Sequence, residues 1–73
     1  MITVQVYSKS TGKPLSGRKV YVSFSGLLRG GLEGYTNSNG EVHLNADPGE
    51  GEVFVSGSRV HKGYLSGRVV VYS

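Results

Sequence analysis

The residues that could catalyse a reaction or bind a metal ion are few in this chain. His43 and His61 are its only histidines, and the 73-residue sequence contains no cysteine. His43 alternates with Val42 and Leu44, so we expect it on the solvent side of a strand, and we expect His61 to be solvated as well. A zinc site needs three or four ligands in a fixed geometry, and the spacing supplies no third ligand. We therefore predict no metal ion, no cofactor and no catalytic residue.

Other motifs with chemical meaning fail on spacing. The run from Asn37 to Gly40 resembles the start of a calcium loop, but an EF-hand needs glutamate six residues after its glycine, and Ala46 stands there. The Arg29-Gly30-Gly31 segment lacks the Lys-Ser/Thr pair of a phosphate-binding loop. No Gly-x-Ser-x-Gly segment, which would hold a nucleophilic serine, occurs in the chain. The sequence therefore predicts a protein that is not an enzyme.

The aromatic residues indicate binding. Tyr7, Tyr21 and Phe54 each alternate with the valines of an expected strand, so they point away from the core. If the first, second and fifth strands share a sheet, these side chains share its outer face, and Tyr72 joins them if its parity matches. Two interpretations remain open. The rings either shield a thin sheet by cross-strand packing or form a contact surface for a partner, because tyrosine and phenylalanine are enriched at interfaces.

Glycine is concentrated between the second and third expected strands. Gly26, Gly30, Gly31 and Gly34 fall within nine positions, and each glycine inside a helix costs about 1 kcal/mol relative to alanine. We therefore expect a loop around a short irregular strand. Arg29, Gly30 and Gly31 form a second candidate contact site.

The elements that must position these residues are strands. Period-two alternation recurs at 2–8, 18–25, 33–36, 41–45, 51–57 and 67–72, with a weak additional strand at 59–62. Valine, which half-buried sheets favour, supplies 11 residues. The pattern predicts one all-β domain over 1–73, a small immunoglobulin-like or prealbumin-like antiparallel sandwich of six or seven short strands. Leu15 is expected to cap the core, whose expected members are Ile2, Val4, Val6, Val20, Val22, Phe24, Val42, Leu44, Val53, Val55, Val69 and Val71.

Turns separate these strands. We expect Gly40 to take a positive φ in a hairpin and Gly49 to take one after a proline. The residues to which we assign turns are Pro14, Gly17, Asn39, Gly40, Pro48 and Gly49.

Charge is arranged in blocks. The net charge of +3 divides into +5 for residues 1–30, −5 for 31–52 and +3 for 53–73. Either the opposite blocks meet across a small fold, or they give a surface suited to contacts between copies. Only Arg18 and Lys19 are adjacent basic residues, and no nucleic-acid-binding motif is present, so we do not expect nucleic acid as a partner.

The sequence contains no run of about 20 apolar residues that could span a membrane and no secretory signal. We expect a full-length chain to be cytoplasmic or packaged in a particle. A domain excised from a larger protein would instead be extracytoplasmic.

The order of the motifs resembles a known family. Thr11-Gly12-Lys13-Pro14-Leu15-x-Gly17, then Tyr35-Thr36-Asn37-x-Asn39-Gly40, then Gly49-x-Gly51-x-Val53-x-Val55 looks like the carboxypeptidase regulatory-like domain. The resemblance covers residues 2–57 and implies a transthyretin-like, seven-stranded sandwich. Hydrolases of this fold end in Tyr-Arg-Gly-Ser, whereas this chain ends in Val71-Tyr72-Ser73, so their activity is not carried over.

These observations favour a non-catalytic structural or protein-interaction module within a larger assembly or polypeptide. Its expected partner is another protein or a second copy of itself. A glycan-binding, adhesive module is the alternative, and a transthyretin-like hydrolase is a remote one.

Overall fold

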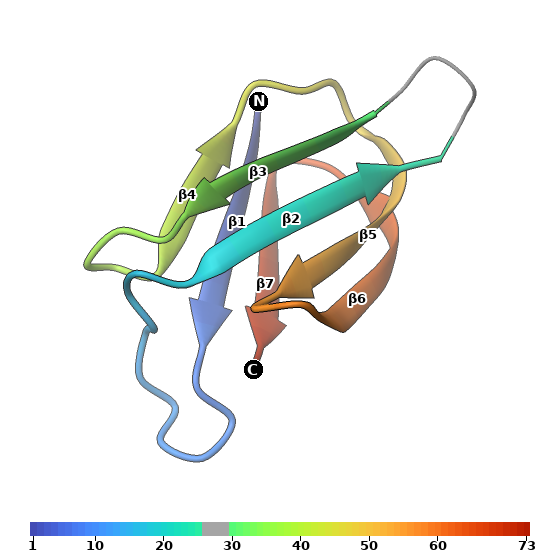
Figure 1. The fold of residues 1–73 in the computed structure, drawn as a ribbon. Coiled ribbons are helices and arrows are strands. Elements are labelled where there is room, and N and C mark those ends of the chain that lie inside the picture. The colour runs from blue at the N-terminus through green and yellow to red at the C-terminus, as the bar shows by residue number, and fades with distance from the viewer. Residues whose placement is uncertain (26–29) are drawn as a thin grey trace.

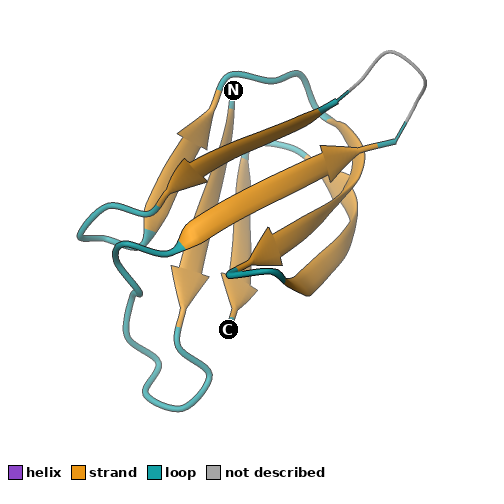
Figure 2. Ribbon diagram, in the orientation of Figure 1, coloured by secondary structure: helices purple, strands orange, loops and turns teal. Residues whose placement is uncertain are grey.

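The computed structural model describes residues 1–25 and 30–73, and in these residues the chain forms seven strands (Figure 1). Figure 2 shows only strands and loops in this part of the chain, so the all-β prediction is confirmed. The strands are β1 (Ile2–Tyr7), β2 (Lys19–Phe24), β3 (Gly31–Tyr35), β4 (Glu41–Leu44), β5 (Gly49–Val55), β6 (Ser58–Leu65) and β7 (Arg68–Tyr72).

The strands form two sheets, a three-stranded sheet in the order β4-β1-β7 and a four-stranded sheet in the order β3-β2-β5-β6. The strands of one sheet pass in front of those of the other in Figure 1, as expected for a small sandwich. Neighbouring strands are antiparallel except β1 and β7, which are parallel. The first and last strands of the chain therefore lie side by side.

The core lies between the sheets. Side chains alternate between the two faces of a strand, and all the residues predicted to point inward are buried. Leu15 packs against this core, as expected. Leu65 was not predicted, yet it is fully buried, because β6 continues three residues beyond the strand expected at 59–62.

The segment that joins β3 to β4 is not a hairpin, because these two strands belong to different sheets. Asn37 organises it: its Oδ1 accepts hydrogen bonds from the N–H of Asn39 at 2.9 Å and of Glu41 at 3.0 Å. Gly40 has the predicted positive φ, at 77°. A Cβ on Gly40 would lie 2.6 Å from the carbonyl oxygen of Val6, so glycine also permits a close approach to β1. The turn was located correctly, but it crosses between the sheets.

Pro48 lies in the connection between β4 and β5, but the prediction for Gly49 is wrong. Gly49 has no positive φ, and it begins β5 opposite Leu65. The positive φ values lie at the other end of β5, at Ser56 (51°) and Gly57 (87°). Two central residues with positive φ are what a type I′ hairpin requires, and they connect β5 to β6. The sequence interpretation had taken this Ser-Gly pair as the end of a strand.

The segment from Pro14 to Arg18 crosses from β1 to β2, and a buried threonine holds it in place. Pro14 forms an isolated bridge with Tyr7, and Gly17 has a φ of 67°. The hydroxyl of Thr36 donates to the carbonyl of Leu15 at 2.7 Å and accepts from the N–H of Arg18 at 2.9 Å. Thr36 therefore ties the crossover to the end of β3.

Candidate interaction surfaces

The aromatic residues predicted to share one face are divided between the two sheets. Tyr7 is on β1 and packs against Tyr72 on β7, with ring centroids 5.9 Å apart. Tyr21 on β2 packs against Phe54 on β5 at 6.0 Å. The shared face depended on the first, second and fifth strands lying in one sheet, and β1 lies in the other sheet. Strand parity predicts which side of a sheet a residue occupies, but not which sheet contains the strand. The outward orientation of all four side chains follows the alternation of the burial pattern.

The Tyr21–Phe54 pair lies in an open depression on the outer face of the four-stranded sheet. Its volume is about 300 Å³, and it is lined by Lys19, Tyr21, Glu33, Phe54 and Gly57. We call this site the aromatic depression. A volume near 300 Å³ is at the lower end of the range for ligand pockets, so it can accept a few side chains or one small ring.

Ion pairs lie on both sides of the Tyr21–Phe54 pair. Lys19 Nζ lies 3.3 Å from Glu33 Oε2, and Glu33 is opposite Tyr21. Arg59, which is opposite Phe54, lies 2.8 Å from Glu52. Exposed pairs of this kind contribute only about 0.2–1 kcal/mol each. Their side chains can therefore exchange this contact for one with a partner at little cost.

The three residues of the predicted contact loop have different positions. Arg29 lies outside the described residues. Gly30 precedes β3, and its carbonyl accepts a 3.4 Å hydrogen bond from Phe24. Gly31 is the first residue of β3, and a side chain there would collide with the ring of Tyr21. The absence of a Cβ at Gly31 thus lets the Tyr21 ring lie over β3, which makes this glycine part of the aromatic surface.

Two further tyrosines lie on the same face of the sheet, outside the lining of the aromatic depression. Tyr35 pairs with Lys19 and Tyr64 pairs with Glu50, so both point outward from edge strands of this sheet. They are 67% and 63% exposed. These two tyrosines were not among the contact residues predicted from the sequence. Each directly precedes an inward-facing residue, Thr36 or Leu65, and this alternation would have indicated that the tyrosine points outward.

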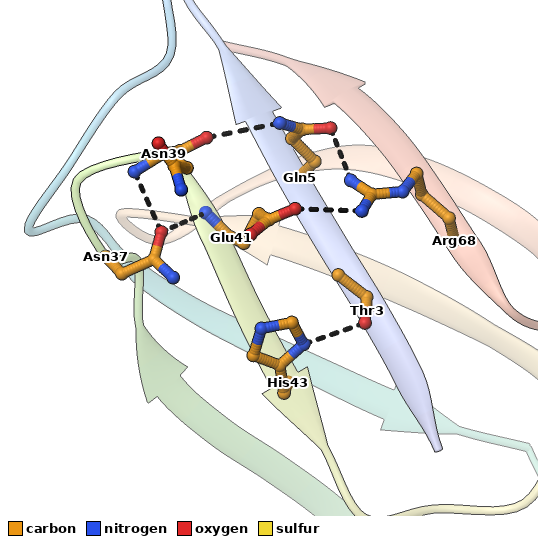
Figure 3. Close-up of polar contacts among 7 residues, drawn as sticks. All are labelled: Thr3, Gln5, Asn37, Asn39, Glu41, His43 and Arg68. Atoms are coloured by element: carbon orange, nitrogen blue, oxygen red, sulfur yellow. Dashed lines mark hydrogen bonds and ion pairs between the residues drawn. The ribbon is translucent and has the colours of Figure 1, made fainter.

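The outer face of the three-stranded sheet carries a polar network (Figure 3). Arg68 on β7 reaches over β1, donating to Gln5 Oε1 at 2.6 Å and pairing with Glu41 of β4 at 2.8 Å. Gln5 in turn donates to the carbonyl oxygen of Asn39 at 3.2 Å. The network links the three strands of the sheet through polar side chains, and most of its groups satisfy one another, so it leaves few groups to bind a ligand.

The histidines occupy two different environments. His43 is exposed, as expected, and its Nδ1 lies 2.9 Å from Thr3 Oγ1 (Figure 3). His61 is half-buried, and it pairs with the buried Val53, which places it on the inner face of β6. Within residues 1–25 and 30–73, no group of three His, Asp or Glu side chains is placed to hold a metal ion.

The charged blocks of the sequence meet in the fold. In the described part of the chain, each of the three ion pairs joins a glutamate from 31–52 to a cation from outside that segment. The first interpretation of the charge pattern, contact across a small fold, therefore accounts for Glu33, Glu41 and Glu52.

Comparison with known protein families, with curated proteins and with solved structures finds no match for this chain. No helix long and apolar enough to cross a membrane occurs among the described residues.

Proposed function

We propose that this chain is a non-catalytic protein-interaction module, part of a larger assembly or polypeptide, that binds a polypeptide partner at the aromatic depression. The observation that carries the proposal is the placement of Tyr21 and Phe54 in an open depression between two ion pairs. Aromatic anchors in a partly enclosed site, surrounded by polar groups, are the usual composition of a binding hot spot.

Shielding of the sheet does not account for all of these aromatic groups. Tyr21 is 38% exposed and covers Gly31, which is consistent with shielding. Tyr35 and Tyr64, in contrast, expose more than 60% of their surface, so most of each ring covers nothing. Exposed rings on the face that carries the aromatic depression are better explained by contact with a partner.

The platform under the aromatic depression consists of the central strands of the sheet. Tyr21 and Phe54 are directly opposite each other on β2 and β5, the two central strands of the sheet. Because the strands fix both backbones, binding would order few additional groups, and a preformed site loses less entropy on association. The ion pairs offer both signs of charge at the rim, so the expected partner segment presents an apolar side chain to the rings and charged residues beside it.

A peptide selection tests this proposal. A displayed library of random peptides would be selected on the wild-type protein, and binders would be titrated while backbone resonances are followed by NMR. We expect the largest shifts in β2, β3 and β5, and at least a tenfold loss of affinity in Tyr21→Ser. Tyr7→Ser, which removes a ring from the other sheet, is the matched control and should bind normally. Binders that shift only other surfaces, or a selection that yields none, would reject the proposal.

Glycan binding is the second candidate. The specific observation in its favour is that Lys19 and Glu33, a donor and a carboxylate acceptor, stand beside the exposed ring of Tyr21. A sugar could place its apolar face on the ring and its hydroxyls at the ion pair. A glycan array with wild-type protein and Tyr21→Ser distinguishes the two functions, because reproducible hits that require Tyr21 would favour a sugar over a peptide.

We further propose that the chain is related to the carboxypeptidase regulatory-like domain. The support is local: Gly17 and Gly40, at matching motif positions, both have positive φ values, and Pro14 lies in the crossover between the sheets. The relationship would be tested by an experimental structure of a domain that carries the full family motif, which should have the same sheet order, β4-β1-β7 and β3-β2-β5-β6.

A further inference from the structure

The last strand of the chain leaves one side of its backbone without a neighbour in the described structure. β7 lies at the edge of the three-stranded sheet, next to β1. The N–H of Thr3 donates to the carbonyl of Gly67 at 2.8 Å, and the N–H of Ser73 donates to the carbonyl of Tyr7 at 2.9 Å. The backbone groups of Gly67 and Ser73, immediately before and after β7, therefore point toward β1.

These two contacts fix the direction of every peptide group in β7. Along a strand, the N–H and C=O of one residue point to one side and those of the next residue point to the other side. Arg68, Val70 and Tyr72 alternate with the residues whose backbone groups point toward β1. Their own backbone donors and acceptors therefore point to the free edge. Their side chains also share the outer face of the sheet, where Val70 is 42% and Tyr72 is 52% exposed.

The other sheet edges carry features that hinder pairing with another strand. β4 has only four residues. β3 contains Gly31, Glu33 and Gly34 within five residues. β6 has a register shift opposite Val53 and Phe54, and its Gly63 has a φ of 149°.

β7 is also short, with five residues, but it lacks the glycines of β3 and the register shift of β6. Its centre is Val69-Val70-Val71, in regular register with β1. Its only charged residue, Arg68, is paired with Glu41 across β1. The charge is thus held away from the free edge and neutralised.

We propose that a second copy of this chain pairs with β7 in antiparallel orientation, around a two-fold axis at Val70, to join two three-stranded sheets into one continuous sheet. In this register Val70 faces Val70 of the second copy, and Arg68 faces Tyr72. Each of the three residues whose backbone groups point to the free edge then faces another such residue. Each facing pair exchanges two N–H···O hydrogen bonds. A register centred on Val69 or Val71 forms fewer of these hydrogen-bonded pairs within β7. The register centred on Val70 is therefore favoured.

The side chains fit the same register. Directly opposite residues have Cβ atoms about 5 Å apart, so the two Val70 side chains would cover each other. Tyr72 would lie against the aliphatic stem of Arg68 from the second copy, a surface that long cationic side chains commonly offer. The interface uses neither sheet's inner face nor the aromatic depression, so it stands independently of the proposed peptide site.

Amide exchange at several protein concentrations tests the edge directly. We expect the amides of Val69 and Val71, bonded to β1, to be protected at every concentration. The amides of Val70 and Tyr72 should become protected only as sedimentation shows the doubled mass. A chain that stays monomeric at millimolar concentration, or a dimer in which these two amides exchange freely, would overturn the proposal.

Cysteine cross-linking tests the register, since the native chain has no cysteine. Across the proposed two-fold axis the two Val70 Cα atoms would be about 5.5 Å apart, within the range that a disulfide spans. Val70→Cys should therefore form a covalent dimer on mild oxidation. Tyr72→Cys should not, because its two copies would lie four residues apart along the strand, about 14 Å. The reverse pattern would exclude this register.

A pair of lysine substitutions then separates β7 from the other edges. Val70→Lys places two like charges opposite each other and should raise the dimer dissociation constant at least tenfold. Tyr35→Lys, at a more exposed position on an edge of the other sheet, should leave dimerisation unchanged. Circular dichroism verifies that both variants fold. Equal weakening by both substitutions would contradict a specific role for β7.

Discussion

Tyr21 and Phe54 stand directly opposite each other on β2 and β5, with ring centroids 6.0 Å apart and planes inclined by 48°. Tilted aromatic pairs at such distances contribute about 0.5–1.5 kcal/mol beyond the area that they bury. In a double-mutant cycle with Tyr21→Ala and Phe54→Ala, urea denaturation should show a coupling of this size. Tyr7→Ala combined with Phe54→Ala, on opposite sheets, should be additive. A Tyr21–Phe54 coupling near zero would mean that the rings pack independently.

Gly31→Ala should alter the aromatic depression while the protein remains folded. The new methyl group would overlap the end of the Tyr21 ring, and a partly exposed side chain can move aside. We expect changed aromatic NMR shifts of Tyr21 and Phe54, and weaker binding of peptides selected on the wild type. Gly30→Ala is the control, because a Cβ there has no heavy atom within 4 Å. Unchanged Tyr21 shifts in Gly31→Ala would show that the ring does not lie over β3.

Gly40→Ala should be more destabilising than a chemically identical change elsewhere. Gly40 has a φ of 77°, and a Cβ would lie 2.6 Å from the carbonyl oxygen of Val6. Gly12 has nearly the same φ, 74°, but a Cβ there meets nothing within 4 Å. We expect Gly12→Ala to cost the left-handed penalty alone, about 1–2 kcal/mol, and Gly40→Ala to cost more. Equal losses in thermal or urea denaturation would show that the close approach to Val6 is not limiting.

Local patterns in the sequence were sufficient to predict the core and several turns. Alternation assigned Val4, Val22 and Val53 to the interior correctly, because parity decides which face of a covered strand a side chain occupies. Parity does not predict which strands belong to one sheet, and this is why Tyr7 and Tyr21 do not share the face on which they were expected.

The other differences between the predicted and the observed structure also arise from contacts between residues far apart in the sequence. The Asn37–Gly40 turn has the composition of a hairpin, yet its strands enter different sheets. Gly34 also shows this dependence, since a Cβ there would come within 2.6 Å of Val42 on β4 of the other sheet. The aromatic depression combines residues from three strands and one turn, so no local pattern could have delimited it.

Thr36→Val should cost about 1–3 kcal/mol in the free energy of unfolding. Thr36 is only 5% exposed, and its hydroxyl bonds to the carbonyl of Leu15 and the N–H of Arg18. Valine has the same shape but leaves these two backbone groups without their partner, and the penalty for unsatisfied buried groups is of this size. Thr3→Val, whose hydroxyl contacts His43 at an exposed position, should change stability by less than about 0.5 kcal/mol. A similar effect of both substitutions would mean that the crossover does not depend on Thr36.

Ser56→Asn should stabilise the protein by relieving the β5–β6 hairpin. Ser56 is the one described non-glycine residue with a positive φ, 51°, and Gly57 follows it with 87°. Asparagine tolerates this left-handed conformation better than serine, and Asn-Gly is a preferred pair for a type I′ turn. We expect a gain of about 0.5–1 kcal/mol, of the order seen for substitutions that suit the native backbone. Ser58→Asn, two residues later in β6, keeps the same chemical change outside the turn and should give no gain. If Ser56→Asn lowers the midpoint of urea unfolding, the backbone of this turn is not the type I′ form that its φ values indicate.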